Sequence, residues 1–241
     1  MRIDTIIPGV YRVPLGMVNI FLIECDGCLT LIDTGLPGST QRILAAMGEL
    51  GFHPGDLQHI LITHPHMDHI GSLIEIRERT GAEAYMHCLD ADLLRAGVPG
   101  RPVKPAPGLV SGLIYRLFIA PSSRNATDAD PVNIENDLYG GEVLEFTRGL
   151  QVIHTPGHTA GHLVFLLPEE GGVLFTGDLA SAMFGLGYPP IFEDFEQGLQ
   201  SLAEISKLDF EIACLAHGKP ILECASDVFK QKWGNKAAII R

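Results

Sequence analysis

Apolar positions in the first quarter of the chain alternate between strand-like and helix-like spacing. Two runs rich in β-branched and aromatic residues flank the turn-forming pair Asp26-Gly27, which predicts a β-hairpin. From Ser39, a residue typical of helix N-caps, apolar side chains recur at helical spacing until Gly51 ends the pattern. The predicted elements are strands over 18–24, 29–33 and 59–62 and a helix between Ser39 and Gly51. The chain therefore opens with sheet and returns to it after one helix.

The second half of the chain repeats the style of the first half. Short apolar strands, separated by turn residues, alternate with amphipathic segments. The expected helices cover 73–81, 90–95, 195–207 and the segment from about 226, and the expected strands cover 84–87, 143–146, 152–154, 163–167, 173–175 and 212–215. This order predicts the α/β class: an αββα sandwich in which two mixed sheets pack face to face with helices outside.

Residues 97–132 differ from both halves, and we expect them to form an insertion that crosses the surface and carries one helix. Prolines cluster over Pro99–Pro105, an apolar run follows over Ala106–Ala120, and polar residues come next. The run is apolar on more than one helical face, so it is expected to contact something besides its own core edge. A lid over a binding pocket is the first interpretation, and a homodimer interface or a packed helix is the alternative.

Composition narrows the class of protein and of partner. With 241 residues, of which 46% are hydrophobic, the chain can bury a substantial core, and one domain over 1–241 is expected. The net charge of −12 opposes nucleic-acid binding, which needs a basic surface. No run reaches the roughly 18 apolar residues of a membrane helix, so no membrane partner is expected. A small-molecule substrate is the partner that remains.

Cysteine usage and the N-terminus indicate the compartment. Five cysteines cannot all pair within one chain, and the N-terminal residues do not form an export signal, so a reducing cytoplasm is the expected location. Cys25 and Cys28 have the spacing of a redox or metal motif, but they flank the predicted turn and have no second such pair to complete a zinc knuckle. They are therefore interpreted as structural thiols.

The strongest chemical signal is the segment Thr63–Gly71, which reads THPHMDHIG and follows a predicted strand. A single histidine at a strand end is ordinarily a structural residue, but three imidazoles and a carboxylate within six residues need a shared partner such as a metal ion. In an extended segment His64 and His66 point to the same side and can grip one ion. Asp68 and His69 follow where a helix is expected to start, and they suit a second ion.

Three later motifs also place ligand-type residues in loops after strand-like runs: TPGHTAGH over 155–162, TGD over 176–178 and AHG over 216–218. Together with the HPHMDH segment and the LIDTG turn over 31–35, this order of motifs resembles the metallo-β-lactamase superfamily. The resemblance covers most of the chain. It implies the αββα fold of that superfamily, a centre with two metal ions and hydrolase activity.

The resemblance also implies which residue holds which ion. The implied ligands are His64, His66 and His158 for the first ion, Asp68, His69 and His217 for the second ion, and Asp178 as the bridge. Asp33 is expected to orient His69 through a hydrogen bond, with an ordinary aspartate in a glycine-containing turn as the alternative. His162 is expected behind the ligands, as a supporting or packing residue. The cofactors are two divalent ions, with zinc as the first choice and iron or manganese as alternatives.

A centre of this kind supplies hydroxide at neutral pH, so no serine or cysteine nucleophile is needed. Asp68 and Asp178 are the expected catalytic carboxylates, Asp68 because it can orient the hydroxide or carry its proton. The leading interpretation is hydrolysis of a neutral, partly apolar carboxylic ester or lactone. The alternatives are a thioester hydrolase of the glyoxalase II type, then a β-lactamase-like hydrolase or a diiron oxidoreductase, and, outside enzymes, a metal-binding module without turnover.

An apolar pocket is expected above the metal ions, because the resemblance puts an insertion at this position beside the metal centre. The side chains expected to line this pocket are Met17, Leu113, Phe118, Phe184 and Tyr188. An apolar wall over a polar metal floor is the usual combination for binding a small organic ligand.

Overall fold

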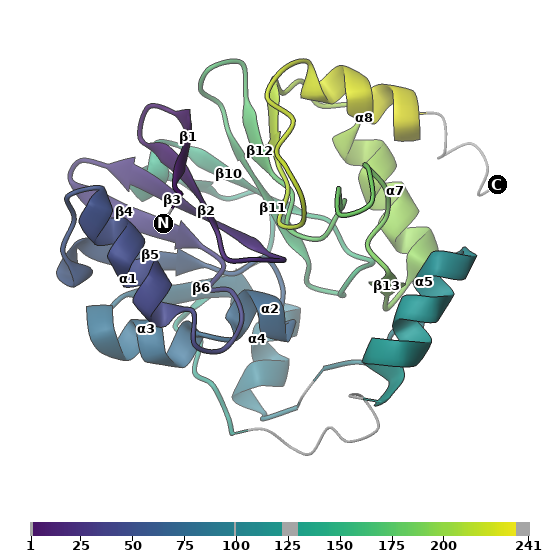
Figure 1. The fold of residues 1–241 in the computed structure, drawn as a ribbon, viewed down its shortest axis with the longest axis horizontal. Helices are drawn as coiled ribbons and strands as arrows, with labels where there is room; N and C mark the ends of the chain where they lie inside the picture. The colour runs from purple at the N-terminus through teal and green to yellow at the C-terminus, as the bar shows by residue number, and fades with distance from the viewer. Residues whose placement is uncertain (1, 99, 122–129, 235–241) are drawn as a thin grey trace.

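The computed structural model describes residues 2–98, 100–121 and 130–234, and for residue 118 the backbone alone. Within these residues, the larger of two main sheets has seven strands in the order β1-β2-β3-β4-β5-β6-β8 (Figure 1). The strands of this sheet are β1 (Asp4–Ile7), β2 (Val10–Pro14), β3 (Asn19–Cys25), β4 (Cys28–Ile32), β5 (Leu57–Leu61), β6 (Glu83–His87) and β8 (Asn136–Leu138). From β4 to β8 the neighbours run parallel, so the loops that follow these strands meet at one edge.

The second sheet has five strands among the described residues, in the order β14-β12-β11-β10-β9. These strands are β9 (Val143–Leu144), β10 (Leu150–His154), β11 (Leu163–Leu167), β12 (Val173–Phe175) and β14 (Ile212–Cys214). Only the pairing of β12 with β14 is parallel within this sheet. A separate two-stranded sheet joins β7 (Lys104–Pro105), from the predicted insertion, to β13 (Ile191–Phe192).

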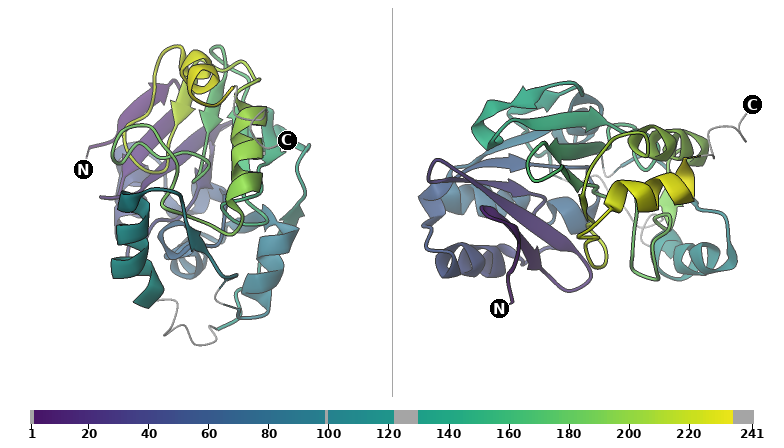
Figure 2. Two further views of the ribbon diagram at one scale, coloured as in Figure 1. Left: turned by 90° about the vertical axis from the view of Figure 1, so that its right-hand side faces the viewer. Right: turned by 90° about the horizontal axis from the view of Figure 1, so that it is seen from above.

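Helices cover the outer faces of the two main sheets. The helices are α1 (Thr40–Glu49), α2 (Met67–Ile70), α3 (Leu73–Thr80), α4 (Cys88–Arg95), α5 (Leu109–Ile114), α7 (Phe195–Ile205) and α8 (Ala225–Trp233). Figure 1 shows α1 and α3 on one side of the sheets and α7 and α8 on the other, and Figure 2 shows the same layers from two further directions. The predicted αββα sandwich is confirmed.

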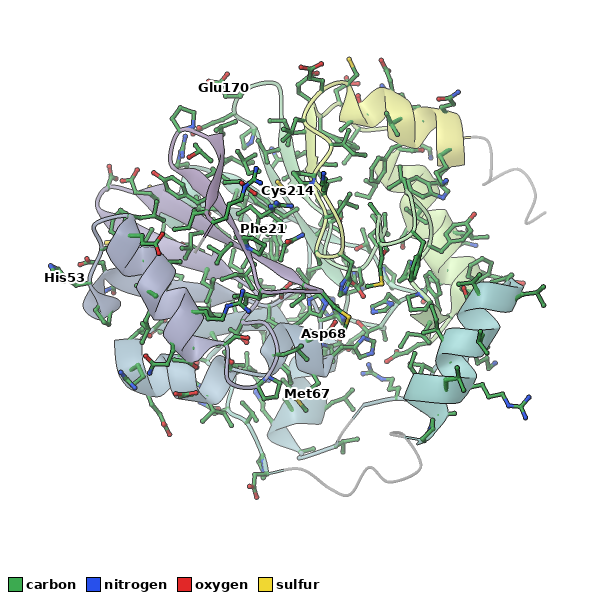
Figure 3. The ribbon with its side chains drawn as sticks, in the orientation of Figure 1. Phe21, His53, Met67, Asp68, Glu170 and Cys214 are labelled. Atoms are coloured by element: carbon green, nitrogen blue, oxygen red, sulfur yellow. The ribbon has the colours of Figure 1, made fainter. Side chains whose placement is uncertain are left out.

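Alternate side chains of strand β3 point into two different apolar clusters, one on each face of the larger sheet. Ile20 and Leu22 are buried in the apolar cluster that also contains the inward residues of α1 and α3. Phe21 and Ile23 point the other way, into the cluster between the two sheets, where the rings of Phe21 and Phe175 meet edge to face at 5.3 Å. Because successive side chains of a strand point to opposite faces, a strand buried on both faces reads as a continuous apolar run. Figure 3 shows Phe21 and Cys214 in this interior.

The hairpin between β3 and β4 has the predicted turn. Cys25 of β3 lies opposite Cys28 of β4 in the strand pairing, and the two residues between them, Asp26 and Gly27, have φ angles of 51° and 79°. Two consecutive left-handed residues are the mark of a type I′ turn, which Asp-Gly favours. Cys25 and Cys28 are free thiols at the end of this hairpin.

Two predicted elements extended two residues too far. The strand expected over 143–146 ends at Leu144, because the chain continues as a 3₁₀ turn over Glu145–Thr147 in which the Thr147 hydroxyl donates to the Leu144 carbonyl. The helix expected to reach position 207 ends at Ile205, with Ser206 as its C-cap. The hairpin of β1 and β2 was not predicted, although Pro8-Gly9 forms its turn.

The insertion carries helix α5, which continues as a π-helical turn over Tyr115–Ile119. Figure 2 shows that α5 stands apart from both main sheets. Leu109, Val110, Leu113 and Leu117 are exposed on it. Among the described residues, none of the helices has both the length and the apolar character that a membrane span requires.

Candidate metal centre

The predicted ligands lie in loops at the ends of strands. The segment after β5 bends at Thr63 and reaches His66, which is the N-cap of the short helix α2, and Asp68 and His69 lie on that helix. His158 lies in the loop after β10, and further loops after β12 and β14 carry the remaining ligands, Asp178 and His217. Segments far apart in sequence therefore meet at one edge of the sandwich, where Figure 3 shows Asp68.

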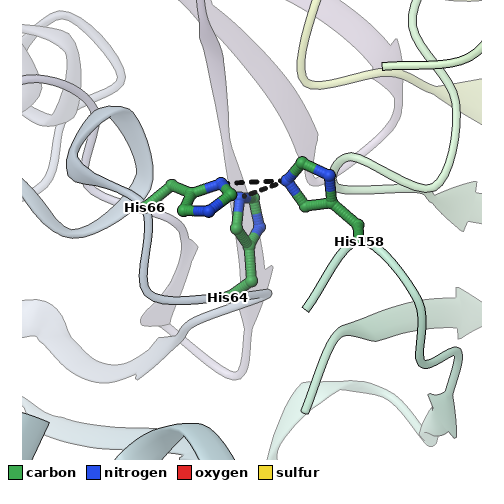
Figure 4. Close-up of side chains that lie close together, drawn as sticks. All are labelled: His64, His66 and His158. Atoms are coloured by element: carbon green, nitrogen blue, oxygen red, sulfur yellow. Dashed lines mark hydrogen bonds between the residues drawn. The ribbon is translucent and has the colours of Figure 1, made fainter. Parts of the chain in front are cut away.

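Three imidazoles form the first group. The Nε2 atom of His158 lies 3.2 Å from Nε2 of His64 and 2.9 Å from Nδ1 of His66. Figure 4 shows the three rings converging from two segments of the chain. Burial and the neighbouring imidazoles hold the pKa of His64 well below its ordinary value and lower the pKa of His158 to about 3, and burial also lowers the pKa of His66. Neutral rings with converging lone pairs are the state that metal coordination requires.

Asp68, His69 and His217 form the second group, in which one ligand atom of each residue lies within 4.8 Å of the others. The Nε2 atom of His217 is 3.3 Å from Oδ2 of Asp68, and Nε2 of His69 is 3.8 Å from the same oxygen. The side chain of Asp68 is partly exposed, whereas the ring of His69 is fully buried. Asp68 is therefore the member of the second group that is open to solvent.

Asp178 lies between the two groups and directs one carboxylate oxygen toward each. Its Oδ1 atom is 3.2 Å from Nε2 of His217 and 3.6 Å from Nε2 of His69. Its Oδ2 atom is 3.4 Å from Nε2 of His158. Burial raises the pKa of Asp178, but positive charge on His217 and His69 outweighs it and holds the pKa well below the ordinary value. The carboxylate is thus ionised between two sets of nitrogen ligands.

Two observations test whether divalent cations fit this set. Among the described residues, the buried atoms Nε2 of His69 and Oδ1 of Asp178 have no hydrogen-bond partner, which is costly unless an ion satisfies them. Burial lowers the pKa of both His69 and His217, but the nearby carboxylates outweigh it and raise these values to about 9 and about 11. The negative charge of Asp68 and Asp178 therefore favours a positive charge at Nε2 of His69 and of His217, and a metal ion can supply that charge in place of a proton. The residues fit divalent metal ions.

The far side of each buried ring is held by an oxygen atom. Nδ1 of His69 lies 2.8 Å from Oδ2 of Asp33, and Nδ1 of His64 lies 3.0 Å from the hydroxyl of Thr63. The other two contacts are to backbone carbonyls: Nδ1 of His158 is 2.9 Å from the oxygen of Ile191, and Nδ1 of His217 is 2.7 Å from the oxygen of Met17. Such contacts fix the tautomer and direct Nε2 of each ring toward the centre.

Asp33 makes the contact with His69 that was predicted. The residue follows β4 with a left-handed φ of 61° and is buried. Besides His69, its carboxylate accepts hydrogen bonds from the backbone N–H and the hydroxyl of Thr63. The same carboxylate thus anchors the start of the histidine segment and the ring of one ligand.

His162 lies behind the ligands. Its Nε2 atom accepts a hydrogen bond from the backbone N–H of Asp178 at 3.0 Å, and its Nδ1 atom is 2.8 Å from the hydroxyl of Thr155. Burial and His158 hold the pKa of His162 well below its ordinary value. Its ring therefore supports the backbone that carries Asp178.

Sequence reasoning missed three charged residues that hold the loop of His158: Asp90, Arg101 and Glu193. Asp90 is fully buried on α4 and accepts hydrogen bonds from Thr159 and Gly161. Arg101 pairs with Asp90. The available signal was the position of Asp90 directly beside Ala91 on the buried face of an amphipathic helix, where a carboxylate needs partners.

The predicted pocket residues that the structure describes differ in their exposure. The side chains of Met17 and Phe184 are 71% and 76% exposed, and that of Leu113 is 58% exposed. The ring of Tyr188 packs against Phe195 and Trp233 within the apolar cluster of α7 and α8. The prediction for Phe118 concerns a side chain outside the described part of the structure. The pocket and the lid over it stay predictions.

The chain matches the family model described as the metallo-beta-lactamase superfamily over residues 13–217. It is 34% identical to the uncharacterized protein YobT of Bacillus subtilis (strain 168) over 162 residues, which are 67% of this chain and 61% of that protein. It is 27% identical to the probable metallo-hydrolase YflN of the same organism over 231 residues, 88% of this chain and 85% of that protein. It is 31% identical to a hydroxyacylglutathione hydrolase of Cereibacter sphaeroides over 179 residues, 73% of this chain and 52% of the hydrolase.

Two solved structures illustrate the likeness in fold. The subclass B3 metallo-β-lactamase BJP-1 of Bradyrhizobium japonicum superposes with a TM-score of 0.71 at 22% identity, covering 100% of this chain and 93% of that one. A metallo-β-lactamase family protein from Thermus thermophilus superposes with a TM-score of 0.68 at 25% identity, covering 97% and 81%. At these identities the likeness concerns the fold.

Proposed function

The chain belongs to the metallo-β-lactamase superfamily as a metallo-hydrolase, and we propose that it uses two divalent ions to hydrolyse a neutral, partly apolar carboxylic ester or lactone. The observation that carries the proposal is the placement of Asp178, whose two oxygens face two separate groups of ligand atoms. A carboxylate that faces two groups suits two ions better than one.

We assign His64, His66 and His158 to one ion and Asp68, His69 and His217 to the other, with Asp178 between them. When bound, two ions at such a site activate a water molecule near neutral pH and polarise the carbonyl of the substrate. We propose zinc as the first choice, because imidazole and carboxylate ligands suit it, with iron or manganese as alternatives.

The chain's own residues supply orientation and proton transfer. Burial raises the pKa of Asp68, but His69 and His217 outweigh it and lower the pKa to about 2, so Asp68 is a carboxylate at neutral pH. From its partly exposed position it can accept the proton of the attacking water and return it to the leaving oxygen. Asp33 and the carbonyl oxygens behind the rings keep the ligands oriented throughout.

Charge and surface chemistry support the substrate class. A net charge of −12 opposes polyanionic substrates such as nucleic acids. The apolar side chains of Met17 and Phe184 are exposed, and both belong to segments that hydrogen-bond to His217. The carbonyl of Met17 contacts Nδ1 of His217, and the backbone N–H of Ala182, two residues before Phe184, donates to the carbonyl of His217. A neutral acyl group suits such surroundings. A thioester is the second candidate, because of the 31% identity to a hydroxyacylglutathione hydrolase.

Metal content and a panel of substrates test the proposal together. Elemental analysis should give two ions per chain, and lactones and carboxylic esters should be turned over faster than thioesters, β-lactams and phosphodiesters. Complete chelation should abolish activity, and zinc, manganese or iron should restore it. Activity that survives verified removal of metal would exclude the mechanism, and preference for a thioester would select the second candidate.

Substitutions separate the assigned ligands from other histidines. His66→Ala and His158→Ala should each lower the metal content and abolish hydrolysis, because either change leaves the first ion short of a ligand. His53→Ala is the matched control, since His53 lies on the surface and outside the three ligand groups. Near wild-type turnover in a folded His158→Ala protein would refute the assignment.

A further inference from the structure

The loop that carries His158 is held by a buried carboxylate from another part of the fold. Asp90, on α4, is fully buried and accepts a hydrogen bond of 2.6 Å from the hydroxyl of Thr159, the residue next to His158. It also accepts one of 3.2 Å from the backbone N–H of Gly161. A β-carbon at Gly161 would lie 2.6 Å from the carboxylate carbon of Asp90, so the loop approaches this side chain as closely as a glycine allows.

One arginine compensates the charge of Asp90. Nη1 of Arg101 is 2.7 Å from Oδ1 of Asp90 and 3.6 Å from Oε2 of Glu193, and Nη2 donates to the carbonyl of Leu89. Glu193 in turn accepts a hydrogen bond of 2.8 Å from the backbone N–H of Ala160. The loop after His158 is therefore gripped by two acidic side chains, and Arg101 pairs with both.

The same stretch of the insertion reaches His158 by a second route. Three residues after Arg101, strand β7 begins, and its Pro105 pairs with Ile191 of β13. The carbonyl of Ile191 is the group that contacts Nδ1 of His158 at 2.9 Å. Residues 101–105 are thus linked to the loop of His158 by two sets of contacts. Arg101 reaches the loop through Asp90, and Pro105 reaches the ring of His158 through Ile191.

We propose that Arg101 and Asp90 are positioning residues for His158, which tie the start of the insertion to the affinity for the metal ion held by His64, His66 and His158. The inference rests on the proposed two-metal function. Arg101 fixes the carboxylate of Asp90, Asp90 fixes the loop through Thr159 and Gly161, and the loop sets where Nε2 of His158 lies. Neither residue is among the groups of ligand atoms themselves.

The experiment is a titration of the metal-free, full-length protein with Zn²⁺ against a chromophoric chelator, and with Co²⁺ followed by its absorption spectrum. In Arg101→Met, one of the two binding steps should weaken by roughly 10- to 100-fold, the range found for residues that orient a metal ligand. The Co²⁺ spectrum of that step should change. Arg101→Lys, which keeps the charge, should recover part of the affinity.

Arg95→Met is the matched control. Arg95, the last residue of α4, resembles Arg101 in pairing with two carboxylates, those of Asp92 and Asp137, and in donating to one backbone carbonyl, that of Ile134. Its side chain is 30% exposed, as is that of Arg101. These partners lie on α4, on β8 and just before β8, and not in the loop of His158, so Arg95→Met should cost stability without changing either binding step.

Two outcomes overturn the inference. A folded Arg101→Met protein that binds both ions with wild-type affinity would do so, and so would equal weakening in Arg101→Met and Arg95→Met, which would indicate a general loss of stability. If Arg101→Met does not fold, Thr159→Val takes its place, because it removes the link to Asp90 and leaves no charge unpaired. Wild-type affinity in that variant would overturn the inference equally.

The failure of the proposed function would look different. A wild-type protein that binds neither Zn²⁺ nor Co²⁺ would overturn the proposed function and this inference together. Two ions in the wild-type protein, with unchanged affinity in the Arg101→Met variant, would overturn this inference alone.

Discussion

Replacing Asp33 by asparagine tests whether the carboxylate behind His69 controls metal binding. Asparagine has the same shape and tolerates the left-handed φ of 61°, so the backbone need not move. Oδ1 of Asp33 accepts from the backbone N–H of Thr63, and Oδ2 faces Nδ1 of His69 at 2.8 Å. Whichever way the amide turns, its NH₂ group meets an N–H donor where an acceptor is required.

The structure sets the size of the expected effect. If the amide faces His69, the ring must move or take the tautomer with its proton on Nε2, the atom directed toward Asp68 and Asp178. Either change removes a buried, charge-assisted hydrogen bond, which contributes about 1.5–3 kcal/mol. At about 1.4 kcal/mol for each tenfold change, affinity for the ion held by His69 should fall roughly 10- to 100-fold.

Competition titration with Zn²⁺ measures this affinity, and thermal unfolding in the presence of a chelator measures the metal-free stability, which should fall by a similar free energy. Asp26→Asn is the matched control, because Asp26 has a φ of 51° but lies exposed in the β3–β4 turn. A folded Asp33→Asn protein with zinc affinity within about twofold of wild type would refute the reasoning.

Asp178→Asn should leave the chain folded but lower metal occupancy and kcat, which elemental analysis and steady-state kinetics would measure. The loss should exceed the roughly 10- to 100-fold typical of residues that hydrogen-bond to a metal ligand without being one. Burial and His154 lower the pKa of His87 below 6.5, so the native state takes up fewer protons than the unfolded chain and loses stability as pH falls below that value. In His87→Asn, which can still accept the N–H of Leu89, unfolding followed in chelator should show a smaller loss of stability between about pH 7 and pH 5. Leu113→Asp should slow hydrolysis of long-chain acyl substrates more than short-chain ones, by roughly 0.8 kcal/mol for each methylene that is no longer buried, whereas a shifted monomer–dimer balance with unchanged chain-length preference would identify an interface.

Local patterns were sufficient where a residue's role depends on its neighbours in sequence. The β3–β4 hairpin follows from Asp26-Gly27 between two apolar runs, and the segment His64–His69 concentrates ligand atoms at a strand end. The β1–β2 hairpin was missed because both strands are short, only Ile7 is buried in β1, and Tyr11 and Arg12 interrupt the apolar run of β2.

Contacts between distant segments were beyond local patterns. A charged residue on a short helix ordinarily faces solvent, and the position of Asp90 beside Ala91 does not indicate that the loop of His158 is the segment that buries it. Its partner Arg101 comes from the insertion, and Glu193, which also pairs with Arg101, comes from the segment after β13, so only the fold brings the three together. The carbonyl of Ile191 cannot be predicted from residue type, because every residue has one.

The carbonyls of Ile191 and Met17 orient two of the ligand histidines through the backbone, so the side chains at these two positions can change without removing the orienting oxygen. The backbone oxygen of residue 17 orients His217, while its side chain is 71% exposed beside the same centre. A substitution at position 17 can therefore change the side chain beside the centre and still present the same oxygen to the same imidazole. Such a position is the natural place to begin a directed search for altered specificity.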